Sequence, residues 1–166
     1  MLRKMTGFER DSEGDWVVEL GCAHRQHVRH KPPFQNHAWV TSDEGRTSRL
    51  GQELNCPLCD RLEPPHGLEV YKRTPECTTE TIPQGLLRDH TLKSGVWGRI
   101  HVLEGQIEYT IPSLGGKMHQ SLLQPGNVGI VAPEVPHHIA PIGPVRLFIE
   151  FLQRPPTAPS ELLSKQ

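Results

Sequence analysis

The chain has 166 residues, a formal net charge of −1 and 22% charged residues, with acidic and basic side chains mixed along its length. Nucleic-acid binding needs a clustered basic face, so this balance disfavours it. There is no apolar run of about 18 residues, and residues 1–15 lack the apolar centre of a secretory signal. These absences predict a cytoplasmic protein without a membrane span, in which the four cysteines stay reduced.

The chain is expected to divide near Glu63–Gly67, because paired prolines followed by glycine interrupt helices and central strands. Before this point cysteines and histidines cluster, and after it short apolar runs alternate with turn residues. We therefore predict a small domain over residues 1–63 and a second domain over residues 64–155. Residues 156–166 are predicted to form a flexible tail.

The first domain offers few regular elements. Asp15–Leu20 is predicted as a strand, with Thr6–Glu9 as its hairpin partner. Arg46–Leu54 is predicted as a short helix that leads into a pair of cysteines.

Cysteine and histidine spacing in this first domain predicts a structural zinc site. Cys56 and Cys59 form a C-x2-C pair, which places two thiolates on one side of a turn, and Cys22 supplies a third. Three histidines compete for the fourth position: His24, His27 and His30. The compact C-x-H spacing between Cys22 and His24 favours His24. A domain of about 60 residues with few large apolar side chains is marginally stable by itself, and a bound metal would supply the missing stability. A redox-active thiol pair is the alternative.

The segments GDWVVELGCAHRQHVRHKPP, HAWV and LGQELNCPLCD resemble a small bacterial family of uncharacterised function over residues 3–62. The resemblance implies a zinc-ribbon-like domain and carries no activity.

The second domain reads as many short strands, which is typical of an all-β sandwich or barrel. Strands are predicted at residues 68–72, 86–92, 96–103, 106–111, 119–123, 128–131, 137–140 and 145–152. The turns between them are predicted at Glu104–Gly105, Leu114–Lys117, Pro125–Gly126, Pro133–Pro136 and Ile142–Pro144.

One acidic residue, Glu150, lies in the apolar run LFIEFL. An unpaired charge among apolar side chains costs several kcal/mol, so such groups are usually paired, protonated or bound to metal. Because strand side chains alternate, Arg99 and His101 share one face of their strand, and polar groups from separate strands can converge inside a barrel.

The segments VLEGQIEY and PGNVGIVAPEVPHHI resemble the two motifs of cupins. With YKRTPE, GLLRDHTLKSGVWGRIHVLEG and VRLFIEF, residues 67–153 resemble the small cupin domain of bacterial tellurite-resistance proteins. The resemblance implies a double-stranded β-helix, or jelly-roll, barrel with a metal inside. The usual H-x-H of the first motif is reduced here to His90.

Three residues are predicted to hold the barrel metal: His90, His137 and Glu150. Two histidines and one carboxylate with open positions suit Zn, Fe, Mn or Ni. Arg99 and His101 are predicted to contact the bound ligand. A buried Arg99–Glu150 ion pair without metal is the alternative.

The resemblance implies a metal-binding protein in resistance to tellurite-like oxyanions or related stress, with a small-molecule or oxyanion ligand. A cupin-type oxygenase or isomerase is an alternative, because a facial triad leaves positions for substrate. An adaptor, with a zinc module that binds a partner and a cupin that senses a ligand, is a third reading. Whether the protein is an enzyme stays open, and a homodimer is compatible with apolar outer strand faces.

Overall fold

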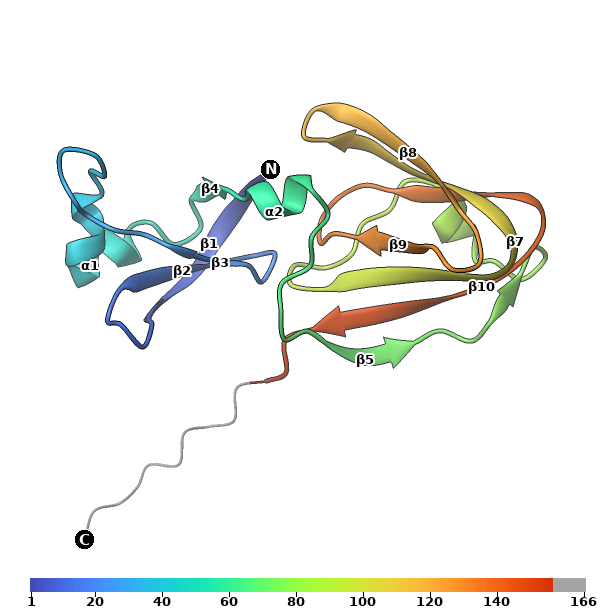
Figure 1. The fold of residues 1–166 in the computed structure, drawn as a ribbon, viewed down its shortest axis with the longest axis horizontal. Helices are drawn as coiled ribbons and strands as arrows, with labels where there is room; N and C mark the ends of the chain where they lie inside the picture. The colour runs from blue at the N-terminus through green and yellow to red at the C-terminus, as the bar shows by residue number, and fades with distance from the viewer. Residues whose placement is uncertain (157–166) are drawn as a thin grey trace, which may run out of the picture.

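The computed structural model describes residues 1–156, which form two antiparallel β-sheets, one from each part of the chain (Figure 1). The N-terminal sheet has four strands in the order β3-β2-β1-β4, and the C-terminal sheet has six strands. The predicted mainly β composition is confirmed. Apart from its first residue, the predicted tail at 156–166 lies outside the described residues.

The N-terminal sheet is built on the predicted hairpin. Its strands are β1 (Leu2–Arg10), β2 (Trp16–Leu20), β3 (Arg25–His27) and β4 (Glu53–Asn55). β1 pairs with β2, with Glu9 opposite Val17, and β4 covers the other edge of β1. Three short helices complete this part: η1 (Ala38–Thr41), α1 (Asp43–Thr47) and α2 (Pro57–Asp60).

The helix predicted at Arg46–Leu54 was misplaced. The helix α1 begins earlier, because the Ser42 hydroxyl accepts a hydrogen bond from the Gly45 amide and caps its first turn. Gly51 adopts a φ of 80°, a left-handed conformation that ends the helical path, and the following residues join β4.

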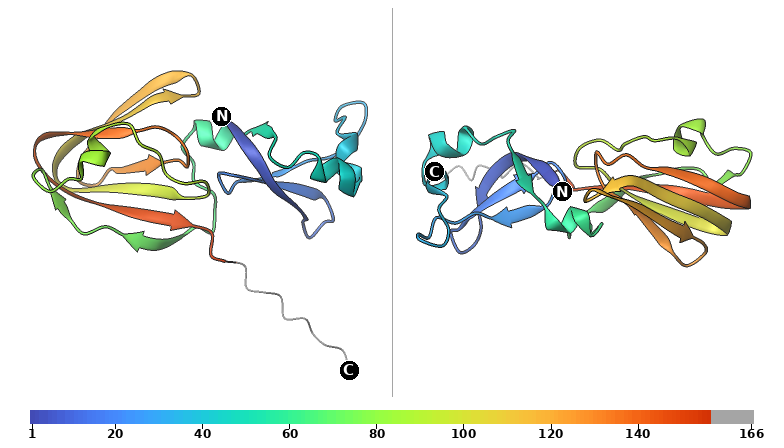
Figure 2. Two further views of the ribbon diagram at one scale, coloured as in Figure 1. Left: turned by 180° about the vertical axis from the view of Figure 1, so that it is seen from behind. Right: turned by 90° about the horizontal axis from the view of Figure 1, so that it is seen from above.

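The C-terminal sheet curls on itself, as two views at right angles show (Figure 2). Its main path is β5-β10-β7-β8, with β6 added to β10 and β9 added to β7. The strands are β5 (Glu69–Arg73), β6 (Cys77–Thr78), β7 (Trp97–Leu114), β8 (Lys117–Leu123), β9 (Val128–Val131) and β10 (His138–Gln153). A single helical turn, η2 (Gln84–Leu87), precedes β7.

Two predicted turns lie instead within continuous strands. β7 runs through Glu104–Gly105, and β10 runs through Ile142–Pro144, with shifts of register where the two strands pass each other. Gly105 has a φ of 74°, and a Cβ there would lie 2.1 Å from the Pro144 carbonyl oxygen. The glycines therefore mark a bulge in paired strands, not chain reversals.

The strand predicted at residues 86–92 is absent from the described structure. This segment holds η2 and two isolated bridges, which join His90 to His137 and Leu92 to Pro133. These two bridges attach the segment to residues 133–137 without making it a regular strand.

Buried side chains form one continuous core through both sheets. Val18, Leu20 and Cys22 of the first part belong to the same buried cluster as Trp97 of the second, and Trp97 is fully buried. Among the described residues, no helix has the length and apolarity needed to cross a bilayer.

Candidate metal centre

Four buried side chains from two separate loops place their ligand atoms within 4.8 Å of one another: Cys22, His24, Cys56 and Cys59. The first two follow β2 in a loop that we call the knuckle loop, residues 21–24. The other two lie at the start of α2, where Cys56 is the N-cap and Cys59 is one turn later. This is the predicted set, and it could bind a metal such as zinc.

The spacing of the four atoms suits a tetrahedral ion. His24 Nδ1 lies 3.3 Å, 3.4 Å and 3.6 Å from the sulfur atoms of Cys22, Cys56 and Cys59, and the first two sulfurs are 3.9 Å apart. Zinc–sulfur and zinc–nitrogen bonds of about 2.3 Å and 2.0 Å require edges of roughly 3.5–3.8 Å in a tetrahedron. The donor set therefore fits Zn²⁺ with little movement.

The knuckle loop turns tightly enough to aim both of its ligands inward. The Leu20 amide donates to the His24 carbonyl at 2.9 Å, and the Ala23 amide donates to the Leu20 carbonyl at 2.7 Å. Ala23 has a φ of 65°, which is uncommon for a residue with a side chain and marks a strained turn.

The competing histidines lie elsewhere. His27 Nε2 is 2.7 Å from the Asp11 carboxylate on the edge of the N-terminal sheet. His30 lines a separate surface pocket with Arg29 and Asp15.

A hydrogen bond between two thiols of the cluster separates their pKa values. The Cys22 thiol hydrogen-bonds to the Cys59 thiolate, and this bond, with help from His24 and Arg3, lowers the pKa of Cys59 to about 4. The same bond raises the pKa of Cys22, and burial raises the pKa of Cys56. Metal binding must displace the remaining thiol protons, so it releases protons and weakens as pH falls.

Sequence reasoning missed Arg3, whose side chain is 5% exposed. Its Nη1 donates to the Pro133 carbonyl at 2.8 Å, while Nε and Nη2 have no hydrogen-bond partner within residues 1–156. Strand alternation could have indicated its burial, because Arg3 and the buried Met5 lie on the same face of β1.

A second candidate site is the cavity inside the curled C-terminal sheet, with a volume of about 100 Å³. Its walls are almost wholly apolar apart from two imidazoles. The lining residues are Leu86, His90, Leu92, Gly98, Ile100, Val131, His137, Ile139, Ile149 and Phe151.

The two cavity histidines are held as a pair. Their ring centroids are 4.1 Å apart, and their backbones exchange hydrogen bonds of 3.0 Å and 3.1 Å. His90 Nδ1 lies 3.1 Å from the Arg88 carbonyl, and His137 Nδ1 lies 2.9 Å from the Val135 carbonyl. Because a carbonyl only accepts, each Nδ1 donates a hydrogen bond to it, and each Nε2 is free of these contacts. Burial lowers the pKa of His137 to about 4.

Glu150 does not join the two histidines, so the predicted three-residue set is not assembled. Ile149 and Phe151 line the cavity, and strand alternation therefore directs Glu150 to the outer face of β10. There its carboxylate lies 3.0 Å from His101 Nε2. The partner of the acid is a histidine on the neighbouring strand.

Arg99 and His101, predicted to contact a ligand inside the barrel, also lie on the outer face. Their neighbours Gly98 and Ile100 point into the cavity. The His101 ring stacks on Phe148 at 4.6 Å, and the Arg73 guanidinium covers Phe148 at 3.6 Å. The Arg99–Glu150 ion pair, the alternative to a metal set, does not form among the described residues, and Glu150 contacts His101 instead.

Two family models match separate parts of the chain. A family model described as TehB-like domain matches residues 72–149, and one described as protein of unknown function (DUF3565) matches residues 6–63. The resemblance predicted for the second part is thus confirmed at the level of a TehB-like domain.

Two solved structures are similar to part of this chain. TehB from Haemophilus influenzae is 23% identical over 54% of this chain and 32% of its own, with a TM-score of 0.49. A protein from E. coli strain K12 is 23% identical over 55% of this chain and 95% of its own, also with a TM-score of 0.49. The chain thus spans about a third of the length of TehB. No curated protein matches.

Proposed function

We propose that the protein is a metal-binding, TehB-like cupin protein that acts in resistance to a toxic oxyanion such as tellurite, or to a related stress. The observation that carries metal binding is the buried Cys22, His24, Cys56 and Cys59 tetrahedron. The TehB-like match over residues 72–149 supports the oxyanion context. We divide the chain into a zinc-ribbon-like domain at 1–63 and a cupin jelly-roll domain at 64–155.

Zinc in the Cys/His site has a structural role in this proposal. Three sulfurs and one nitrogen fill a tetrahedron and leave no position for substrate. All four ligands are buried, and the N-terminal sheet around them is small. Binding free energy of a structural ion therefore becomes folding free energy for this part of the chain.

The cavity of the C-terminal sheet is the proposed ligand site. The Nε2 atoms of His90 and His137 are free of the carbonyl contacts made by Nδ1 and are available to ligate a transition metal, with further positions open to a small ligand. Without Glu150 the donor set is all nitrogen, which favours Zn, Fe or Ni over Mn. The apolar lining and the volume of about 100 Å³ limit the ligand to a few atoms.

Element-specific metal analysis tests both sites at once. We expect the intact protein to carry zinc that is lost in Cys56→Ser/Cys59→Ser, because two of four ligands are removed. The double variant His90→Ala/His137→Ala is expected to keep that zinc and lose any second metal. His101→Ala is the matched control, since this histidine faces away from the cavity. Zinc content unchanged by loss of both cysteines would end the proposal.

Growth assays test the oxyanion context. Expression of the protein in a tellurite-sensitive host is expected to raise the tolerated tellurite concentration. His90→Ala/His137→Ala is expected to abolish that gain, and His101→Ala to preserve it, because the first variant alters the cavity and the second does not. Equal tolerance with and without the intact protein would contradict a role in tellurite resistance.

A further inference from the structure

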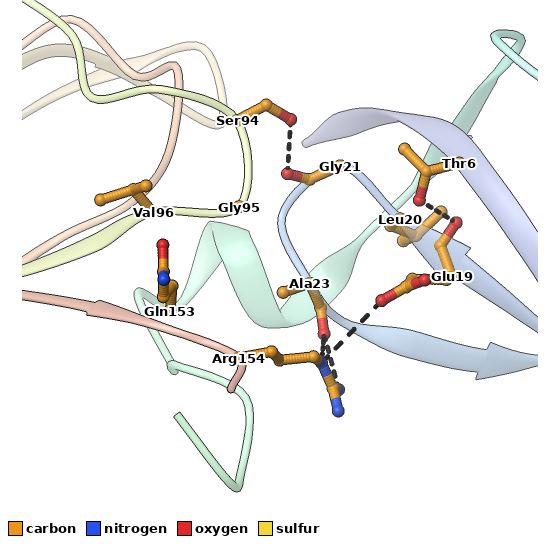
Figure 3. A pocket seen from close by; sticks show the side chains of 10 residues that line it. All are labelled: Thr6, Glu19, Leu20, Gly21, Ala23, Ser94, Gly95, Val96, Gln153 and Arg154. Atoms are coloured by element: carbon orange, nitrogen blue, oxygen red, sulfur yellow. Dashed lines mark hydrogen bonds and ion pairs between the residues drawn. The ribbon is translucent and has the colours of Figure 1, made fainter. Parts of the chain in front are cut away.

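The knuckle loop carries two metal ligands and also provides the contacts that hold the two sheets together. The Gly21 carbonyl accepts from the Gly95 amide at 2.7 Å and from the Ser94 hydroxyl at 2.9 Å. The Ala23 carbonyl accepts from Arg154 Nε and Nη2 at 3.2 Å and 2.8 Å. Figure 3 shows the contact of Ser94 with Gly21 and that of Arg154 with Ala23 around the pocket between the sheets.

The ligand residue Cys22 itself contributes the third carbonyl. It accepts a hydrogen bond of 2.8 Å from the indole Nε1 of Trp97, the first residue of β7. The Trp97 ring also meets the His24 ring edge to face at 5.6 Å. Trp97 is fully buried, so a side chain of the C-terminal sheet forms one wall of the metal centre.

Arg3 provides a second link, through charge. Three thiolates, one neutral imidazole and one Zn²⁺ sum to a net charge of −1, and a buried net charge is costly unless it is paired. Arg3 is a buried cation that lies opposite Leu54 of β4, two residues before the ligand Cys56, and its Nη1 donates to the Pro133 carbonyl. One side chain thus lies beside the metal centre and contacts the backbone of the C-terminal sheet.

The Pro133 segment leads directly to the cavity. It bridges to Leu92, and the Glu134 amide donates to the Leu92 carbonyl at 3.0 Å. Four residues after Pro133, His137 lines the cavity beside His90. The segment that receives Arg3 is therefore the one that positions a cavity imidazole.

We propose that the metal centre is the joint between the two sheets, and that Arg3 is the positioning residue that couples the metal to the loop of Pro133 and His137. The inference rests on the proposed metal binding. Bound metal holds the knuckle loop in place, and three carbonyls of this loop accept hydrogen bonds from the C-terminal part of the chain. Loss of metal frees the loop, weakens these hydrogen bonds and makes the wall of the cavity around His137 more mobile.

Hydrogen exchange of the full chain, with and without zinc, reports on the joint. The Gly95 amide is expected to exchange at least about tenfold faster after chelation under reducing conditions, because its acceptor is the Gly21 carbonyl. The segment 132–137 is expected to follow it. Residues 146 and 147 of β10, which pair with β6 and line neither pocket between the sheets, are the internal reference. Unchanged exchange at Gly95 in protein that has verifiably lost its zinc would overturn the inference while leaving metal binding intact.

Arg3 variants keep the test independent of unfolding. We expect Arg3→Met to weaken zinc binding about 10- to 100-fold, the usual effect of removing a partner of a metal ligand, and to speed exchange in segment 132–137 with zinc bound. Arg3→Lys is expected to restore most of the zinc affinity, because it keeps the charge. Wild-type zinc affinity and exchange in Arg3→Met would overturn the role of Arg3.

Arg46→Met is the matched control for the loss of a buried arginine. Arg46 is 8% exposed, donates to the Val40 carbonyl and stacks on Trp16. Among the described residues, none of its hydrogen bonds reaches a metal ligand. It is expected to lower stability and to leave zinc affinity within about twofold of wild type. An equal loss of zinc affinity in Arg46→Met and Arg3→Met would reduce the effect of Arg3 to general destabilisation and refute the coupling.

Discussion

Glu150 shows which part of a residue's environment a sequence contains. An acid within LFIEFL needs a partner, and the structure supplies one, His101 on the adjacent strand. Strand alternation also predicts that Glu150 faces the opposite side of the sheet from Ile149 and Phe151. The sequence does not show which of the two sides faces the cavity, because that depends on how the whole sheet curls.

Replacement of Glu150 tests this assignment. We expect Glu150→Gln to leave the metal content of the protein unchanged, because the carboxylate faces away from both metal-binding candidates. The expected loss of stability is about 0.2–1 kcal/mol, since the ion pair with His101 is partly exposed. Metal analysis and urea unfolding give the two values. Loss of a metal in this variant would place the carboxylate back among the ligands.

His137 predicts a pH dependence of stability. Burial lowers its folded pKa to about 4 from an ordinary value of 6.5, so below pH 6.5 the unfolded chain takes up a proton that the folded chain does not. The free energy of unfolding should therefore fall as pH falls from 6.5 to about 4, by as much as about 3 kcal/mol.

His137→Asn isolates that contribution, because an amide can still donate to the Val135 carbonyl but does not titrate in this range. We expect urea unfolding of the variant to depend less on pH between 4 and 6.5 than unfolding of the wild type. Parallel curves for the two proteins would contradict a buried neutral imidazole.

At the scale of elements, the sequence predicts strands better than their connections. The hairpin of β1 and β2 and the strand Val128–Val131 are found where the pattern placed them. β7 and β10 were each predicted as two strands, because a glycine with positive φ serves a turn and a bulge equally well. Only the pairing of two long strands distinguishes the two, and pairing is a long-range property.

Gly105 tests the bulge. A Cβ at this position would lie 2.1 Å from the Pro144 carbonyl oxygen, and the φ of 74° adds backbone strain. We expect Gly105→Ala to destabilise the protein by about 1–3 kcal/mol or more. Gly116→Ala is the matched control, because its φ is 83° but its Cβ would meet open space. Equal losses in urea unfolding would show that the clash with Pro144 is relieved without cost.

At the scale of the whole molecule, the Cys/His cluster was predictable and its surroundings were not. Cysteine spacing indicates Cys56 and Cys59, because a C-x2-C pair places two thiols on one side of a turn. Arg3 and Trp97 carry no motif, and they reach the centre only because the two sheets pack against each other. Contacts between distant parts of the chain depend on how their surfaces fit together, which local sequence patterns do not encode.

X-ray absorption at the zinc edge of the intact, reduced protein tests the central claim most directly. The account predicts about three sulfur neighbours near 2.3 Å and one nitrogen neighbour near 2.0 Å around a single zinc. A first shell of nitrogen and oxygen alone, or purified protein that takes up no zinc, would contradict it.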